Sequence, residues 1–471
     1  MDQQSSRHHA IVIGGSITGL LAARVLADHF EKVTVLEKDT LTDTPVPHKT
    51  VPQGYHQHIV LGKGIDLLDN WFPGIIAEII AEGGGRVDAG ADLAWFFHGA
   101  WRPRFTSGLY TLISARPYTE FHVKRRLLAG YTNVVIQDDR HVAGLLVNDD
   151  KTRINGIQLR EPNGNVTSLT ADLVVDAGGR GSQTPEWLEN IGYTKPPEEE
   201  VEINVGYTTN LYPFPENFKE DWKVLAIYPE YPHSWRGGFL SKVQGNQLMV
   251  TLTGYFDDYA PTDEAGYVAF AASLPKPDIY NQIVHQQPIG PAKLYKVVKT
   301  RRRYYEQLAS LPDGLVVVGD AVCVFNPVFG QGITVAACHV AELQQYLANA
   351  ADNAKGFTLA FQRQLINHLD LPWMLTSVID LSYPQTKGKR ARGASVMSWG
   401  LKKMLGACSK DAHVQQVFLR VFHMYEGAAA MASPGFIFRV IWFMIKSAFL
   451  PKSSIMNTKT IPSHSGKDLS R

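Results

Sequence analysis

The 471-residue sequence predicts an α/β fold with three parts: a Rossmann-like nucleotide-binding domain, an antiparallel-sheet domain and a C-terminal helical region. Three observations predict it. An apolar strand at 10–13 runs into a glycine turn and a helix. Runs between about 201 and 254 alternate apolar and polar residues, as in an antiparallel sheet with one face in water. From Thr334 onward the pattern is helical almost to the end.

The N-terminal segment has the layout of a βαβ dinucleotide-binding unit. The strand is followed by the turn G-G-S-I-T-G at 14–19 and a helix, and a second apolar strand ends in Glu37. Gly14 permits the tight turn, and Gly19 lets the helix pack closely on the sheet. The N–H groups at the helix start can receive a pyrophosphate, and Glu37 can accept from an adenosine ribose. Ser16 replaces the middle glycine of G-x-G-x-x-G, and a serine is small enough to let a phosphate approach.

A second glycine-containing module follows the buried strand at 314–318. Asp320 stands at the carboxyl end of this strand, where side chains of a parallel sheet point into the ligand crevice. Gly330 and Gly332 let backbone N–H groups approach the edge of a flat ligand, and a helix that begins near Gly332 adds its dipole. The simpler interpretation is a strand–turn–helix with a capping aspartate. Because the module points at the same crevice as the first turn, we favour a ligand site.

These two modules, with D-A-G-G-R-G-S at 176–182 between them, occur in the order seen in FAD-dependent monooxygenases of the para-hydroxybenzoate hydroxylase fold. The resemblance covers roughly residues 10–341. The middle motif and the P-E-W-L that follows are most similar to the epoxidase branch, which includes squalene epoxidase-like and polyether-type enzymes. The resemblance implies an FAD-binding domain of the glutathione reductase type. The expected parts are residues 1–80, 105–185 and 300–345 for this domain, 81–104 and 186–299 for the sheet domain, and 346–471 for the helices.

The resemblance also implies roles for single residues. Glu37 would bind the adenosine ribose, and Asp320 would contact the ribityl or pyrophosphate region. Arg125 would lie near the pyrophosphate, with Arg116 and Arg126 as alternatives. The predicted cofactor-binding set is Gly14, Gly15, Ser16, Gly19, Glu37, Lys38, Arg116, Arg125, Asp320, Pro327, Gly330, Gln331 and Gly332, the last four along the isoalloxazine ring.

The implied activity is that of a monooxygenase, an epoxidase or hydroxylase of an apolar small molecule. In such enzymes NAD(P)H reduces FAD, O₂ adds to give a flavin hydroperoxide, and oxygen passes to the substrate, so we expect no catalytic side chain and no metal. Gly178-Gly179 stands where the NAD(P)H-associated middle motif usually has Asp-Gly. The alternatives are an FAD-dependent double-bond reductase of isoprenoid type and a non-catalytic FAD-binding interaction protein. A halogenase is disfavoured because the W-x-W-x-I-P run of such relatives is absent.

Three further side chains are candidates for the site. His56 and His58 would share one face of an extended segment, as two metal ligands can. No third ligand follows at metal spacing, so we favour a structural or flavin-adjacent role. Trp235 is either a core aromatic of the sheet domain or part of a substrate pocket.

Composition narrows the function classes. With 46 Lys and Arg against 45 Asp and Glu, the formal charge of +1 gives no field for nucleic acid, and the basic run 301–303 is expected on the solvated face of a helix. Three cysteines make no disulfide framework, which favours a reducing, cytoplasmic location. The N-terminus shows no secretory signal, and no apolar run is long enough to span a membrane.

One C-terminal segment is compatible with a membrane surface. Residues 436–450 are mostly apolar, and Arg439 and Lys446, seven residues apart, share one helical face. Such a helix can lie in a membrane interface as a peripheral contact. It can also dock on the body of the protein and extend its basic side chains to water. We favour the docked helix.

Overall fold

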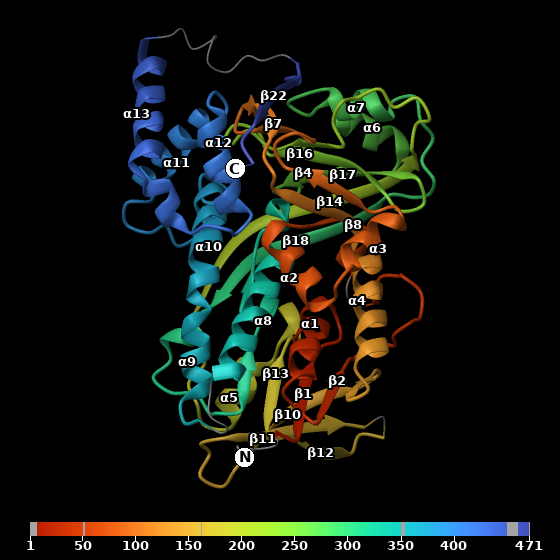
Figure 1. Cartoon of the computed structure of the whole chain (residues 1–471), viewed down its shortest axis with the longest axis vertical. Helices are drawn as coiled ribbons and strands as arrows, with labels where there is room; N and C mark the ends of the chain where they lie inside the picture. The colour runs from red at the N-terminus through yellow and green to blue at the C-terminus, as the bar shows by residue number, and fades with distance from the viewer. Residues whose placement is uncertain (1–6, 50–51, 162, 350–353, 450–459, 471) are drawn as a thin grey trace.

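The computed structural model describes residues 7–49, 52–161, 163–349, 354–449 and 460–470 (Figure 1). The molecule is elongated. A parallel sheet lies at the end that holds the N-terminus, and a large antiparallel sheet lies at the other. The C-terminal helices run along one side and finish in helix α13 at the edge of the molecule.

The parallel sheet has five strands in the order β19-β13-β1-β2-β9. Every neighbouring pair is parallel, so the carboxyl ends of the strands meet at one edge, as the βαβ pattern predicts. Helix α1 (Ile17–Leu26) packs on the sheet, with α4 (Arg116–Gly130) and α8 (Gly332–Asn349) beside it. The strands are β1 (His9–Ile13), β2 (Lys32–Leu36), β9 (Val134–Gln137), β13 (Leu173–Asp176) and β19 (Leu315–Val317).

Two small antiparallel sheets complete the framework, one beside the parallel sheet and one against the large antiparallel sheet. Between β9 and β13 the chain forms β10 (His141–Val147), β11 (Ile154–Arg160) and β12 (Val166–Thr170). The other small sheet has the order β3-β8-β4, with β3 (Gln57–Val60), β8 (Tyr110–Ala115) and β4 (Gly85–Asp88). The nearby helices are α2 (Gly62–Trp71), α3 (Ile75–Ala81) and α5 (Thr184–Asn190).

The predicted antiparallel sheet is confirmed and is larger than expected. Its order is β20-β18-β14-β17-β16-β15-β5-β6, with β21 on the edge of β14, and the pair β15–β5 is parallel. Helices α6 (Glu264–Ala272) and α7 (Asp278–Ile283) close a separate apolar core beneath it. The strands are β5 (Leu93–Phe97), β6 (Ala100–Trp101), β14 (Glu198–Pro213), β15 (Val224–Ile227), β16 (Arg236–Val243), β17 (Gln247–Tyr255), β18 (Lys293–Arg303), β20 (Cys323–Val324) and β21 (Lys387–Gly388).

Strand β18 corrects one expectation. Residues 301–303 end this strand and do not form the solvated face of a helix. They pair with residues 198–200 of β14, and Arg303 Nε lies 2.8 Å from Glu198 Oε1. Glu198 neutralises Arg303, which allows Arg303 to be buried. The strand also continues through residue 300, where the sequence analysis placed a domain boundary.

The C-terminal region is helical, as predicted. Helix α13 is docked through Phe436, and Arg439 Nη1 lies 2.8 Å from Asp411 Oδ2, while residue 450 lies outside the described residues. Among the residues described, no helix has both the length and the apolar character needed to cross a bilayer. The elements are α9 (Phe357–Gln364), α10 (Ile366–Asp380), α11 (Ala394–Cys408), α12 (Ala412–Phe422), α13 (Pro434–Phe449) and β22 (His464–Asp468), which pairs with β7 (Arg104–Thr106).

Candidate cofactor-binding site

A cavity of ≈ 650 Å³ runs from the carboxyl edge of the parallel sheet to the underside of the large sheet. The glycine turn after β1 and the segments 176–183 and 325–333 contribute to its wall. At the far end the wall consists of side chains from β5, β15, β16 and α12. The two glycine modules therefore meet at one crevice, as their positions after parallel strands predict.

The first turn fits closely against its surroundings. Gly14 has a φ of +102°, which favours glycine, and a Cβ there would lie 2.6 Å from the carbonyl oxygen of Ala177. A Cβ on Gly19 would overlap the carbonyl oxygen of Gly14. The two glycines thus allow the turn, α1 and β13 to approach one another. Gly14 lines the cavity, whereas Gly19 is buried beneath it.

Glu37, at the end of β2, is held in place by the backbone. The N–H of Gly15 donates to one carboxylate oxygen at 2.6 Å, and the N–H of Asp39 donates to the other at 3.0 Å. Each oxygen keeps further acceptor capacity for a hydroxyl group. Glu37 is largely buried but lines the cavity, and so does Lys38. The carboxylate is therefore oriented before any ligand arrives.

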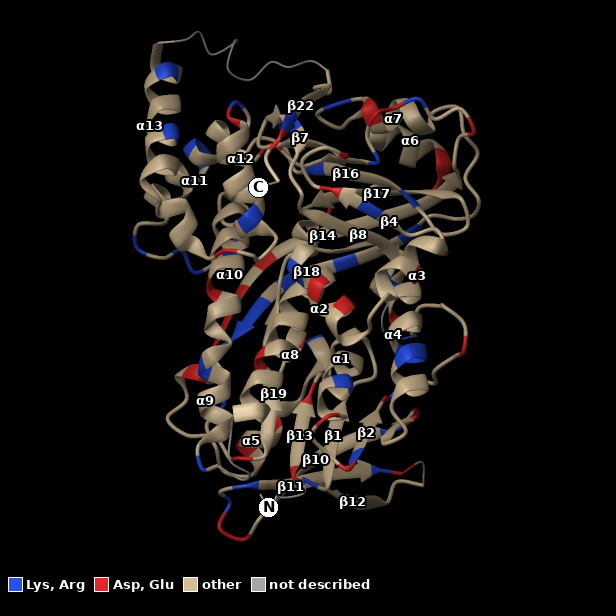
Figure 2. Ribbon diagram, in the orientation of Figure 1, with Lys and Arg blue, Asp and Glu red and all other residues tan. Residues whose placement is uncertain are grey.

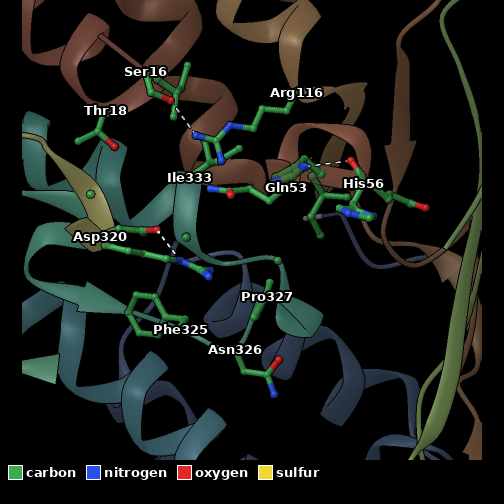
Figure 3. A pocket seen from close by; sticks show the side chains of 18 of the residues that line it. Ser16, Thr18, Gln53, His56, Arg116, Asp320, Phe325, Asn326, Pro327 and Ile333 are labelled. Atoms are coloured by element: carbon green, nitrogen blue, oxygen red, sulfur yellow. Dashed lines mark hydrogen bonds and ion pairs between the residues drawn. The ribbon is translucent and has the colours of Figure 1, made fainter. Parts of the chain in front are cut away.

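Ser16 belongs to a polar cluster at the start of α1 (Figure 3). Its hydroxyl accepts from Arg116 at 2.8 Å and donates to Glu120, which also accepts from the Ile17 N–H at 3.2 Å. Burial alone would raise the pKa of Glu120, but Arg116 and His48, with the Ser16 bond, hold it below its usual value. The ionised Glu120 in turn orients Arg116, which lines the cavity.

Arg125 and Arg126 do not line this cavity. Arg125 pairs with Glu78 and Glu82, and Arg126 Nε lies 2.8 Å from Glu78 Oε2. The expected position of Arg125 beside the pyrophosphate turn is therefore not found. The reason is geometric. Arg116 is the first residue of α4, and Arg125 lies nine residues further on, which is about 13 Å along the helix axis.

The second module forms the opposite wall. Asp320 follows β19, and its Oδ2 lies 3.7 Å from Arg180 Nε (Figure 3). Gly330, with a φ of +66°, closes the short turn Pro327–Phe329 before α8 begins. Of the residues predicted here, Asp320, Pro327, Gly330 and Gly332 line the cavity, and Gln331 is buried outside the lining.

A buried polar network lies behind this module. The Asn326 side-chain amide donates to Tyr255 at 3.0 Å and to Asp380 at 2.8 Å, and its oxygen accepts from the Val328 N–H at 3.1 Å. Asp380 is 1% exposed, and burial raises its pKa to about 8 despite the bond from Asn326. Its carboxyl is therefore mostly protonated at neutral pH. The network anchors the loop that carries Pro327.

The far end of the cavity is aromatic. Trp95 of β5 stacks on Phe97 with ring centroids 5.1 Å apart and lies 6.0 Å from Phe422 of α12. Tyr228 donates its hydroxyl to the carbonyl of Val328 at 2.9 Å, which ties the large sheet to the loop of the second module. The apolar lining here also includes Leu93, Ala226, Phe239 and Leu419.

A curated protein is similar in sequence to this chain over most of the length of both, although no family model matches the chain. Protein Rv3254 of Mycobacterium tuberculosis is 30% identical over 455 residues, which cover 92% of this chain and 93% of that protein. The chain belongs to the Rv3254 family. The motifs described above therefore belong to a member of that family.

Solved structures share the fold at low sequence identity. The flavin-dependent brominase Bmp2 matches with a TM-score of 0.62 and 12% identity over 88% of this chain and 93% of that chain. PqsL, a probable FAD-dependent monooxygenase from Pseudomonas aeruginosa, matches with a TM-score of 0.61 and 14% identity over 83% of this chain and 100% of that chain. A flavoprotein/dehydrogenase from Cytophaga hutchinsonii matches with a TM-score of 0.64 and 16% identity over 94% of this chain and 98% of that chain. The predicted fold class is confirmed: this Rv3254 relative has the fold of flavin-dependent enzymes.

Most side chains in the middle of the cavity could not be assigned to it from the sequence. Gln53, His56 and His58 line it from the segment before and within β3. Burial lowers the pKa of His56 to about 4 and that of His58 to about 3, so both are neutral at pH 7. The structural or flavin-adjacent role considered for them stays a prediction. Trp235 lies outside the lining, where its Nε1 donates to Asp258 at 2.6 Å.

The groups along the cavity suit FAD. Gly14 leaves open a space in the turn that a Cβ would fill. Glu37 provides a carboxylate that the backbone holds in place, and Arg116 provides a cation. The glycine-flanked loop of the second module lies further along the same cavity. Groups of these kinds bind a ribose, a pyrophosphate and a flat ring in dinucleotide-binding folds.

Proposed function

We propose that this protein is an FAD-dependent monooxygenase that uses NAD(P)H and O₂ to epoxidise or hydroxylate an apolar small molecule. One observation carries the proposal: the same cavity joins the dinucleotide turn at Gly14 to an aromatic chamber around Trp95. Nucleotide binding alone does not require a separate aromatic chamber, whereas an enzyme that acts on an apolar substrate does. The flavin-dependent enzymes that share the fold support the choice of cofactor.

The walls of the cavity suggest how FAD would be held. Glu37 would accept from the adenosine ribose, and Arg116 would face the pyrophosphate. Asp320 would contact the ribityl region, and residues 327–332 would lie along the ring. Bound FAD would supply the redox chemistry, taking hydride from NAD(P)H and passing electrons to O₂. The protein supplies binding, orientation and shelter from water.

The aromatic chamber supports an apolar substrate. Trp95, Phe239 and Phe422 present rings to it, and the hydroxyl of Tyr228 is already engaged by the Val328 carbonyl. Such a lining binds non-polar ligands and keeps water from the reacting centre. The squalene epoxidase-like branch remains the family resemblance that we favour for the chemistry.

The test is reconstitution followed by turnover. The purified chain should bind FAD and turn yellow, and NADPH oxidation should be slow alone and faster when a hydrophobic alkene or aromatic compound is added. With ¹⁸O₂, the label should appear in the product. The decisive measurement is mass spectrometry of that product.

Two other outcomes would replace the proposal. Anaerobic turnover that adds hydrogen across a double bond would establish the isoprenoid-type reductase. Tight FAD binding with no NAD(P)H oxidation, over a broad screen of apolar compounds, would establish a non-catalytic FAD-binding protein. A chain that cannot be loaded with FAD would remove all three.

A further inference from the structure

Helices α11 and α13 expose a large apolar surface at the edge of the molecule (Figure 1). Nine of the nineteen exposed large hydrophobic side chains in the described part of the chain lie on these two helices. The two helices pack together where Phe443 lies against Gly406. This α11/α13 face is centred on Val396, Trp399, Phe438, Ile441, Trp442 and Ile445, which are between 48% and 71% exposed. A patch of this kind marks an interaction site.

The segment that contains these two helices is strongly basic in a chain that is nearly neutral. Residues 387–449 hold ten lysines and arginines but only two carboxylates, Asp411 and Glu426. The rest of the sequence holds 36 basic and 43 acidic residues. Figure 2 shows this excess of blue over red on α11 and α13. Lys402 and Lys446 are among the exposed basic residues.

The details of α13 suit a membrane interface. Phe438 and Trp442 stack with centroids 6.5 Å apart, and Lys446 Nζ lies 5.1 Å from the Trp442 ring. Arg439 is instead held by Asp411 at the side where the helix docks. Aromatic rings flanked by a basic residue that can extend to lipid headgroups are typical of helices that lie in the interface. The helix has sixteen residues and does not qualify as a membrane span.

We propose that the α11/α13 face docks on a membrane surface rich in anionic lipid, with its apolar side chains among the headgroups and upper acyl chains. Charge complementarity selects this occupant, because the basic excess attracts anionic headgroups. A second copy seated on the same face would bring two basic surfaces together, which like-charge repulsion opposes. The inference does not rest on the proposed function, since the face lies outside the cavity.

Vesicle co-sedimentation of the full chain tests the proposal. Phosphatidylcholine vesicles are compared with vesicles that mix phosphatidylcholine and phosphatidylserine, at low and high salt. We expect binding to the mixed vesicles that salt weakens. Lys402→Ala and Lys446→Ala should each reduce the affinity about fivefold. The double variant F438S/W442S should abolish binding.

Matched controls use side chains of the same type elsewhere. Val166→Ser and Val298→Ser change valines of β12 and β18 that are 54% and 55% exposed, far from the two helices in sequence. Lys219→Ala removes an exposed charge from a loop outside the α11/α13 face. None of the three should alter vesicle binding. The proposal is overturned if the wild-type chain ignores the mixed vesicles, or if F438S/W442S binds them as well as the wild type. It is also overturned if light scattering shows a dimer that F438S/W442S dissociates while no vesicle binding occurs. FAD binding in solution, measured in the same preparations, reports separately on the proposed function.

Discussion

The two ends of the cavity are built in different ways. At the nucleotide end, Gly14 and Glu37 belong to one continuous βαβ unit, and their placement depends on backbone contacts. At the aromatic end, Trp95, Tyr228 and Phe422 come from segments far apart in sequence: pairing of β5 with β15 brings Trp95 and Tyr228 together, and Phe422 of α12 packs against Trp95. Substitutions at the first end are therefore expected to disturb the backbone of the turn. Substitutions at the second end are expected to change the shape of the chamber and leave the turn intact.

Gly14→Val should give the largest effect. The new side chain would meet the Ala177 carbonyl at a φ of +102°, so we expect FAD affinity to fall more than about 100-fold. Fluorescence titration with FAD measures it. Gly164→Val is the matched control, because Gly164 has a φ of +85° but nothing within 4 Å of its Cβ position. Tight FAD binding by Gly14→Val would show that the turn is not the nucleotide site.

Glu37→Ala removes the acceptor predicted for the ribose. Loss of a hydrogen bond to a charged group costs about 1.5–3 kcal/mol, so FAD should bind about 10- to 150-fold more weakly. Glu31→Ala, at an exposed carboxylate just before the same strand, should leave the dissociation constant unchanged. Equal constants for Glu37→Ala and the wild type would exclude Glu37 from the site.

Arg116→Ala and Arg125→Ala form a pair that decides between two arginines of one helix. Arg116 lines the cavity, whereas Arg125 pairs with Glu78. Arg116→Ala should weaken FAD about tenfold. Arg125→Ala should have no effect on FAD. The reverse result in the same titration would restore the position that the sequence analysis expected for Arg125.

Asp380→Asn probes the network behind the loop of the second module. Asp380 has a pKa near 8 when folded and about 3.9 when unfolded, so between these values the folded state holds a proton that the unfolded state has lost. This residue therefore makes stability fall as pH rises, by about 1.4 kcal/mol per pH unit in that window. Urea unfolding at pH 5 and 7 should show a smaller loss in Asp380→Asn. An identical pH dependence in both proteins would contradict the raised pKa.

Phe422→Ala should give the smallest effect on the cofactor and a specific effect on the substrate. It removes one wall of the aromatic chamber, so the KM for an apolar substrate should rise about fivefold while FAD affinity stays the same. Phe438→Ala, an exposed ring on the α11/α13 face, should change neither quantity in solution. A loss of FAD with Phe422→Ala would mean that the two ends are not independent.

The sequence predicted the positions of the two glycine modules well because glycine positions report backbone geometry directly. Gly14 and Asp320 follow buried parallel strands and lie in the crevice at the carboxyl ends of these strands, as expected for a parallel sheet. Arg125 lies away from the cavity because α4 begins at residue 116, and that helix start was not visible in the sequence pattern. Trp95 and Phe422 could not be paired from the sequence, since nothing local indicates which distant strand and helix will meet.

The pairing of β14 with β18 also bears on how the chain assembles. Glu198 and Arg303 are 105 residues apart, and most of the large sheet is formed by the segment between them. A slip of one strand against the other would separate the charges of Glu198 and Arg303 and leave a buried arginine without its partner. This ion pair therefore favours the observed register of the sheet that covers the cavity.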